Sequence, residues 1–107
     1  MKYEEAKVRA DILKALAHPI RVLLVEALSR GDRCVNELTG LAQVGQSTIS
    51  RHLAQLKKVG IVSERKEGMK VVHHLACPCM LRAFDCTVEV MKAEARRRAD
   101  VLKGAGK

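Results

Sequence analysis

The chain has 107 residues, with 20 Lys and Arg against 12 Asp and Glu, and a formal net charge of +8 at pH 7. A chain of this length forms a single domain, residues 1–107, which buries roughly two-thirds of its unfolded surface. The excess of positive charge favours a polyanionic partner, the alternative being a basic protein with no nucleic-acid role. One Tyr, one Phe and no Trp leave little ring surface for stacking on bases. This composition disfavours a protein that binds single strands or RNA loops.

The first residues and the hydropathy pattern indicate the cellular compartment of the protein. The chain starts with charged residues around Glu4 and Glu5, which do not form a secretory signal. No apolar run approaches the roughly 18 residues that a membrane span needs. We therefore expect a cytoplasmic protein with no membrane partner, whose four Cys are reduced thiols.

Apolar residues at helical spacing predict three helices in the first part of the chain. The first helix covers about residues 4–17 and is broken by His18 and Pro19. Pro19 suits the first position of the second helix, which ends near Gly31. A short third helix covers about residues 35–42, and a tight link follows it.

The most informative stretch is a fourth helix, predicted from residue 46 to its end at Gly60. One face carries apolar residues at helical spacing: Ile49, Leu53, Leu56 and Val59. The opposite face carries hydroxyl, amide and cationic groups: Ser47, Ser50, Arg51, Gln55 and Lys58. Such a helix packs one face on a core and offers the other to base edges and phosphates. With the short helix before it, it predicts a helix-turn-helix over about residues 34–59.

A β-hairpin and a long helix complete the pattern. Strands at 61–66 and 70–75 flank a turn at 67–69, which predicts a basic wing over about residues 61–75. The last helix covers about residues 78–102, and residues 104–107 form a frayed tail. Its apolar stripe is too long for a small core to cover, so we expect it to pack on a partner subunit together with the first helix. The fold class is therefore mainly α with a β-hairpin wing, a winged helix-turn-helix that dimerises through helices at about 4–17 and 78–102.

In this order of elements the chain resembles the ArsR/SmtB family of winged-helix repressors. Two stretches carry the resemblance most specifically: Ala15-Leu16-Ala17-His18-Pro19-Ile20-Arg21 and Ser47-Thr48-Ile49-Ser50-Arg51-His52-Leu53-Ala54-Gln55-Leu56. The resemblance implies a homodimer whose two recognition helices enter successive major grooves of a palindromic operator. It also implies repression that is relieved when an effector binds, often a thiophilic or transition metal ion.

The residues expected to contact double-stranded operator DNA lie on the fourth helix and the wing. They are Gln46, Ser47, Thr48, Ser50, Arg51, Gln55, Arg65, Lys66 and Lys70. Backbone N–H groups at the start of the helix also attract phosphate. Arg can pair with guanine and Gln with adenine, but whether Arg51 meets a base or a phosphate stays open. We expect His52 to pack at the helix edge rather than to read a base.

Cys34 stands where many arsenic- and cadmium-sensing relatives have a Cys-Val-Cys segment, and Asn36 replaces the second thiol. This departure argues against a metal site on the third helix. We expect Cys34 to be a small buried hydrophobic residue instead.

The sharper thiol cluster is Cys77-Pro78-Cys79, with Cys86 further along the chain. Pro78 suits the first turn of the last helix, which places Cys77 near the N-cap and Cys79 just inside. A helix N-terminus stabilises a thiolate, the form that binds soft metals. In zinc-binding relatives the positions matching Val90 and Ala93 supply two further ligands from the partner, and neither side chain here can bind metal.

Cys86 is the substitute ligand that the sequence offers. It follows Cys79 by seven residues, about 10 Å along one helix axis, whereas a metal–sulfur bond is about 2.3 Å. We therefore hypothesise a dimer-spanning metal site of Cys77, Cys79 and Cys86 of the partner subunit. Three thiolates suit arsenite or a soft divalent ion such as zinc or cadmium, and whichever of His73 and His74 points inward is a further candidate ligand.

Other functions stay open from the sequence. The thiols could sense oxidants or persulfides through sulfenate, persulfide or disulfide chemistry. The protein could also be a winged-helix DNA binder whose cysteines are inert. An enzyme built on Cys-Pro-Cys is disfavoured, since the chain lacks alternating strands and helices and a Cys-x-x-Cys motif. We expect a repressor that requires no cofactor.

Overall fold

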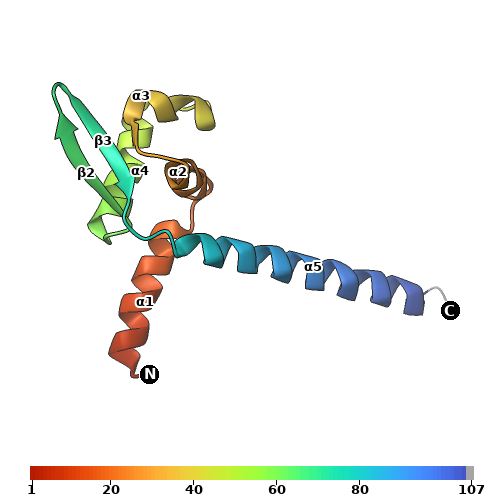
Figure 1. Cartoon of the computed structure of the whole chain (residues 1–107). Helices are drawn as coiled ribbons and strands as arrows, with labels where there is room; N and C mark the ends of the chain where they lie inside the picture. The colour runs from red at the N-terminus through yellow and green to blue at the C-terminus, as the bar shows by residue number, and fades with distance from the viewer. Residues whose placement is uncertain (106–107) are drawn as a thin grey trace.

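The computed structural model describes residues 1–105 and contains five α-helices, one 3-10 helix and three strands within that range. In chain order they are α1 (Tyr3–Leu16), α2 (Pro19–Ser29), β1 (Arg33–Cys34), α3 (Val35–Leu38), the 3-10 helix η1 (Thr39–Leu41), α4 (Gln46–Lys58), β2 (Val62–Glu67), β3 (Lys70–Leu75) and α5 (Met80–Ala105). Figure 1 shows α2, α3 and α4 gathered beside the sheet, with α1 and α5 leaving this body in different directions. The predicted winged helix-turn-helix fold is confirmed.

The core that fixes α4 is made by the helices and the sheet together. Its most buried side chains are Leu24, Val25, Leu38, Ile49, Leu56 and Ile61. The predicted inward face of α4 is confirmed, because Ile49, Leu53 and Leu56 are buried. Burying a side chain of this size contributes about 1.5–3 kcal/mol, so this one apolar stripe determines which face of α4 points to solvent.

The end of α4 sets the direction of the wing. The Gly60 N–H donates to Lys57 O at 3.0 Å, and the Ile61 N–H donates to Leu56 O, also at 3.0 Å. This pair of bonds is a Schellman motif, which needs a left-handed residue after the helix, and Gly60 has φ of +83°. Buried Ile61 and Leu56 supply the apolar contact that accompanies the motif. The chain therefore leaves α4 directly into β2.

The sheet has the strand order β1-β3-β2, with antiparallel pairing throughout. The hairpin of β2 and β3 agrees closely with the predicted wing and turns at Gly68, which has φ of +63°. The strand β1 was not predicted from the sequence; it pairs Arg33 with His73 and Cys34 with Val72. A two-residue strand has no periodicity for a sequence to reveal.

Two predicted helix boundaries need correction. The third helix is α only to Leu38 and continues as the 3-10 helix η1. The last helix begins at Met80 rather than Pro78, because the N–H groups of Met80, Leu81 and Arg82 bond to carbonyls three residues earlier. Cys79 therefore precedes the helix instead of lying inside it. Of the predicted frayed tail, residues 104 and 105 are helical, and residues 106–107 lie outside the described part of the chain.

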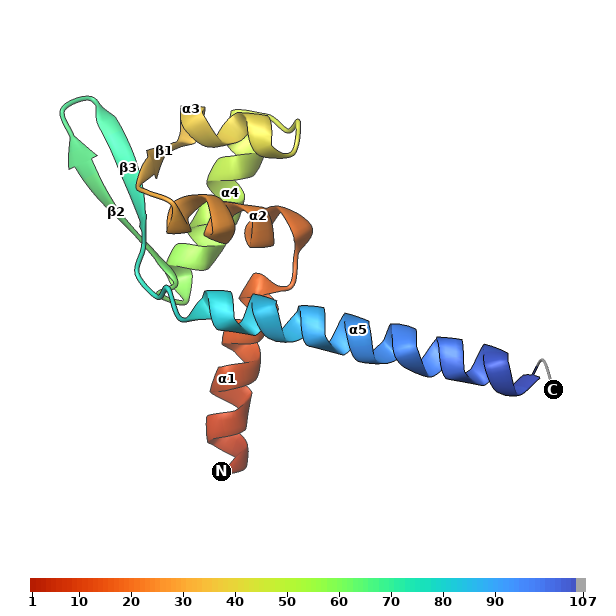
Figure 2. The same cartoon turned by 45° about the vertical axis from the view of Figure 1, so that its right-hand side comes forward.

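The helices α1 and α5 extend away from the body (Figure 2). The radius of gyration of the Cα atoms is 17.9 Å, whereas a compact chain of this length has about 13 Å. Only the start of α5 packs on the core, through Met80, Leu81 and Phe84. No helix within residues 1–105 is both long enough and apolar enough to cross a bilayer.

Candidate nucleic-acid interface

The solvent face of α4 presents the polar residues that the sequence placed there. Ser47, Ser50, Arg51 and Gln55 are exposed, and Thr48 is half-buried. Gly45 occupies the N-cap and offers no side-chain acceptor to the first turn. The opening N–H groups of α4 therefore point toward solvent, where a phosphate can meet them.

Gln46 and Arg51, two of the residues predicted to contact DNA, also make contacts within the protein. The side-chain amide of Gln46 donates to Asn36 Oδ1, which joins the start of α4 to α3. Arg51 Nη2 lies 3.4 Å from Thr48 Oγ1, a long and weak contact within the same helix. Arg51 is thus held along the helix surface but is free to meet another partner.

The three cations of the wing differ in whether they form ion pairs within the protein. Arg65 forms ion pairs with Asp32, at 2.6 Å, and with Glu67, at 2.8 Å. Lys66 and Lys70 are exposed and make no ion pair with any residue in the described range. The sequence could not distinguish these states, because Asp32 lies 33 residues before Arg65.

Asp32 connects the wing to the loop that follows α2. Its second carboxylate oxygen lies 2.7 Å from Nδ1 of His74. The hydrogen bonds from Arg65 and then from His74 hold the pKa of Asp32 below its usual value. His74 therefore faces outward, and the adjacent His73 on β3 is buried.

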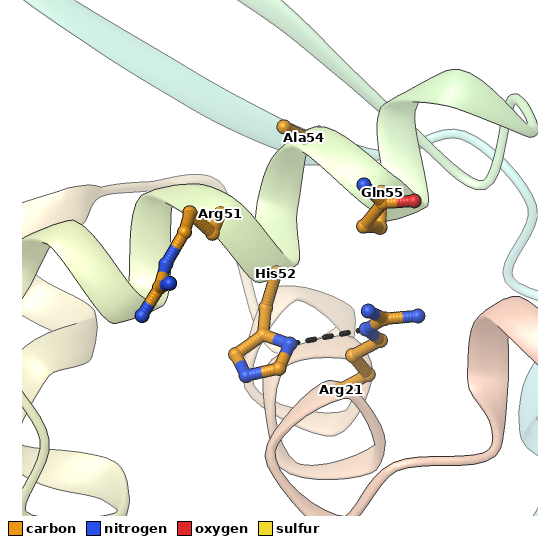
Figure 3. Close-up of a pocket in the computed structure, with 5 residues that line it drawn as sticks. All are labelled: Arg21, Arg51, His52, Ala54 and Gln55. Atoms are coloured by element: carbon orange, nitrogen blue, oxygen red, sulfur yellow. Dashed lines mark hydrogen bonds between the residues drawn. The ribbon is translucent and has the colours of Figure 1, made fainter.

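A cluster at the junction of α2 and α4 was not assigned a role from the sequence (Figure 3). Arg21 Nε donates to Nδ1 of His52 at 3.1 Å, and its Nη1 donates to Ala15 O, also at 3.1 Å. The His18 ring lies 4.3 Å from that of His52, centroid to centroid, and its Nδ1 accepts the Ile20 N–H. The expectation that His52 packs at the helix edge agrees with these contacts. Burial and then the nearby positive charges lower the pKa of His52.

The four cysteines lie in two separate regions. Cys34 is only half-buried, and both its N–H and its thiol lie 3.1 Å from Glu37 Oε1. The expectation of a buried hydrophobic Cys34 is therefore wrong, because the residue caps α3 at a partly open position. The thiol bond and then the N–H bond lower the pKa of Glu37.

The three remaining cysteines sit where the chain enters α5. Cys77 is half-buried with its thiol 3.7 Å from Gly60 O, and Cys79 and Cys86 are exposed. Within residues 1–105 of a single chain, no three His, Cys, Asp or Glu side chains are grouped closely enough to hold a metal ion.

A helix-turn-helix whose apolar face packs on the core, with an adjoining β-hairpin, defines a winged helix-turn-helix protein. Similarity to known proteins identifies the family. Residues 18–64 match the family described as bacterial regulatory protein, arsR family. The uncharacterized HTH-type transcriptional regulator Rv0081 of Mycobacterium tuberculosis (strain ATCC 25618 / H37Rv) is 31% identical over 99 residues, which are 91% of this chain and 86% of that one. The chain belongs to the ArsR family of transcriptional regulators, which are not enzymes.

Another relative and two solved structures agree with this family. The HTH-type transcriptional repressor SmtB of the same strain is 39% identical over 66 residues, 62% of this chain. The chain spans about half of SmtB, since the match covers 49% of it. The crystal structure of Rv0081 has a TM-score of 0.75 at 27% identity, over 92% of this chain and 99% of that one. A homodimeric winged helix-turn-helix DNA-binding domain, Mb0332 from Mycobacterium bovis, has a TM-score of 0.71 at 25% identity, over 91% and 93%.

Proposed function

We propose that this protein is a homodimeric repressor that binds operator DNA and is released by a ligand at its thiols. The observation that carries the DNA-binding part is the two-faced α4, whose buried side fixes its orientation and whose polar side is open. Gln46, Ser47, Thr48, Ser50, Arg51 and Gln55 approach the major groove, and the wing cations Arg65, Lys66 and Lys70 meet phosphates. SmtB, which matches over this region, is named a transcriptional repressor.

The uncovered apolar surface of α1 and α5 supports the dimer. Val8 and Leu13 on α1 are 60% and 58% exposed, and Met91 on α5 is 66% exposed. Monomeric proteins rarely leave contiguous apolar surface of this kind in water. A second copy of the chain, packed along α1 and α5, would cover it and would present two α4 helices to one duplex. Mb0332 is described as homodimeric.

The proposed effector site consists of Cys77, Cys79 and Cys86 of the partner subunit. The accessible thiols at the start of α5 support it, since soft ions such as arsenite, zinc or cadmium select thiolate ligands. Binding releases DNA only if the ligand favours a dimer whose recognition helices are wrongly spaced. The position of the cluster fits this requirement, because Cys77 lies within hydrogen-bond reach of Gly60, where α4 ends.

The redox alternative rests on the same exposure. Cys79 and Cys86 are open to oxidants and persulfides as much as to metal ions. A bond within Cys77-Pro78-Cys79 would be strained, so the oxidised form would join one of them to Cys86 or to another chain.

Operator binding tests both parts of the proposal. Selection from random duplexes first yields the preferred sequence. Replacement of Gln55 by Ala should then cost about 1–3 kcal/mol and relax specificity, whereas replacement of Lys70 by Met should weaken all sequences alike. Failure to enrich any duplex would contradict operator recognition.

A panel of arsenite, cadmium, zinc, oxidants and persulfides then tests release. We expect one class to release DNA from the parent protein but not from the Cys77→Ser/Cys79→Ser variant. The matched control is Cys34→Ser, which removes the thiol at α3 and should leave release unchanged. Equal release from the parent and the double variant would eliminate the proposed thiol site.

A further inference from the structure

A surface hollow of about 430 Å³ lies at the junction of α2 and α4. Its lining consists of Arg21, Arg51, His52, Ala54 and Gln55. In Figure 3, the side chains of Arg21 and Arg51 lie on either side of the His52 ring. His52 accepts the bond from Arg21 at Nδ1, so a neutral His52 carries its proton on Nε2 and is a donor there. Two guanidinium groups, the His52 ring and the Gln55 amide therefore line the hollow, and a set this rich in donors suits a ligand rich in acceptors.

Neither arginine of the hollow forms an ion pair in the described part of the chain, unlike Arg30, Arg65, Arg97 and Arg98. Within residues 1–105, no carboxylate lies within 4.0 Å of the guanidinium of Arg21 or Arg51. By contrast, the exposed Arg30 pairs with Glu26 at 2.8 Å. After burial, electrostatic interactions that include the charges of Arg21 and Arg51 also lower the pKa of His52. The hollow thus concentrates positive charge that the protein does not neutralise.

Arg21 is held in place before any ligand arrives. Its Nε and Nη1 are engaged by His52 and by the Ala15 carbonyl, and its Nη2 makes no hydrogen bond within the described residues. A side chain fixed at two points loses less conformational entropy on binding than a free surface arginine. The geometry is that of an anchored cation beside the DNA-facing surface of α4.

We propose that Arg21, Arg51 and His52, which line this hollow, together bind one phosphate of the DNA backbone in each half-site. The inference rests on the proposed DNA binding and deepens it, since it adds Arg21 from α2 and assigns Arg51 to phosphate rather than to a base. Arg21 reaches the flank of α4 from a separate helix. When α4 occupies the major groove, the DNA strand that borders the groove passes along this flank. Because phosphate contacts fix register, the hollow sets the position of α4 on the duplex.

The salt dependence of DNA binding measures this contact. Each neutralised phosphate adds about 0.9 to the slope of log K against log salt. With a random-sequence duplex as probe, Arg21→Met should lower the slope by about 0.9 per protomer between about 50 and 200 mM KCl. The matched control is Arg30→Met, which removes the same charge at the C-cap of α2, where Arg30 is paired with Glu26, and should leave the slope unchanged.

Arg21 also makes hydrogen bonds within the protein, so Arg21→Met could change the slope by disturbing the fold. A second variant separates this effect from the loss of a phosphate contact. Arg51 is exposed and contacts only Thr48 of its own helix, so Arg51→Met should fold normally and lower the slope equally. If both arginines grip one phosphate, the double variant should lose the slope of one contact rather than two. A loss equal to the sum would assign them to different phosphates and overturn the shared site.

The remaining outcomes separate this inference from the proposed function. DNA binding by the parent with an unchanged slope in Arg21→Met would overturn the phosphate site and leave operator binding intact. No DNA binding by the parent would overturn both. Inorganic phosphate, titrated while the His52 ring is followed by NMR, tests for a free anion as ligand. Ring shifts with inorganic phosphate but none with the duplex would reject the DNA backbone as the occupant.

Discussion

Arg65 of the wing and Asp32 of the loop after α2 are joined by an ion pair, with 2.6 Å between Nη1 and Oδ2. Asp32 also holds His74 from the neighbouring strand, so one carboxylate joins both wing strands to the body. The Asp32 carboxylate therefore competes with any DNA phosphate for the guanidinium of Arg65. The wing is therefore positioned by the same carboxylate that masks part of its positive charge.

Replacement of Asp32 by Asn should strengthen binding to random-sequence DNA. The change removes the Asp32 carboxylate from Arg65, which keeps its ion pair with Glu67, and it removes one negative charge per protomer. The slope of log K against log salt should therefore rise by up to about 0.9 per protomer. Folding stability should change little, because exposed ion pairs contribute little. The matched control is Glu26→Gln, which frees Arg30 at the C-cap of α2, a cation not proposed to meet DNA, and should leave the slope unchanged. Equal slopes for the Asp32 variant and the parent would show that Arg65 does not meet phosphate.

Replacement of Gly60 by Ala should destabilise the protein by about 1–3 kcal/mol, because a side chain at positive φ is strained. An added Cβ would meet no atom within 4 Å, so the cost is conformational rather than steric with the surroundings. Urea unfolding measures it. Gly40 serves as the control, since a Cβ there is equally unhindered and its φ is not positive. Gly40→Ala should be neutral or stabilising by up to about 1 kcal/mol. Equal effects at the two positions would contradict the Schellman ending of α4.

The amphipathic pattern of α4 could be predicted because its determinants are local. Ile49, Leu53 and Leu56 recur at helical spacing, and Gly60 follows where a left-handed residue is needed. The hairpin could be predicted for the same reason, from its strands and the turn at Gly68. These features determined the fold and most of the proposed DNA-facing surface.

Contacts between elements could not be predicted, because they depend on how the elements pack. The bond from Arg21 to His52 joins residues 31 apart in the sequence, although both lie in the two stretches that carry the family resemblance. A cation just inside the Pro-initiated second helix was the available signal, and it did not indicate which side chain it would meet. The orientation of His73 likewise depends on strand register, which the two adjacent histidines left open.

Burial of His73 should make the protein less stable in mild acid. The ring is 5% exposed and neither nitrogen has a hydrogen-bond partner within residues 1–105, so burial lowers its pKa. The nearby Glu64 acts to raise that pKa and Lys57 to lower it. The unfolded chain therefore binds a proton more readily than the folded one. Stability should be greatest above the unfolded pKa of about 6.5 and should fall as the pH drops toward the lower folded value.

Urea unfolding at about pH 7.5 and pH 5.5 measures this loss, with His73→Leu as the test variant. Leu removes the titrating ring and also the two unpaired nitrogens. We expect the parent to lose more stability than the variant between these pH values. The comparison cancels the contributions of His18, His52 and His74, which both proteins share. Equal losses of stability in the parent and the variant would show that protonation of His73 does not cause the destabilisation in acid.

Mixed dimers test whether the proposed effector site spans two chains. One chain carries Cys77→Ser and Cys79→Ser, and the other carries Cys86→Ser. Each homodimer then lacks a complete set of three thiols, whereas the mixed dimer contains one complete set made from both chains. We expect cadmium to bind tightly only to the parent and the mixed dimer, with half the parent's stoichiometry in the mixed dimer. The absorbance of cadmium–thiolate bonds provides the measurement.

The mixed dimer also separates the site from simpler explanations of thiol binding. A set formed within one chain would require Cys86 to share an ion with Cys79, which precedes α5, across six residues of helix or about 9 Å, and bonds of about 2.3 Å do not allow this. If the mixed dimer binds no more cadmium than the two homodimers, the shared site is wrong. Release of operator DNA from the mixed dimer, under metal that leaves both homodimers bound, would then connect the same three thiols to repression.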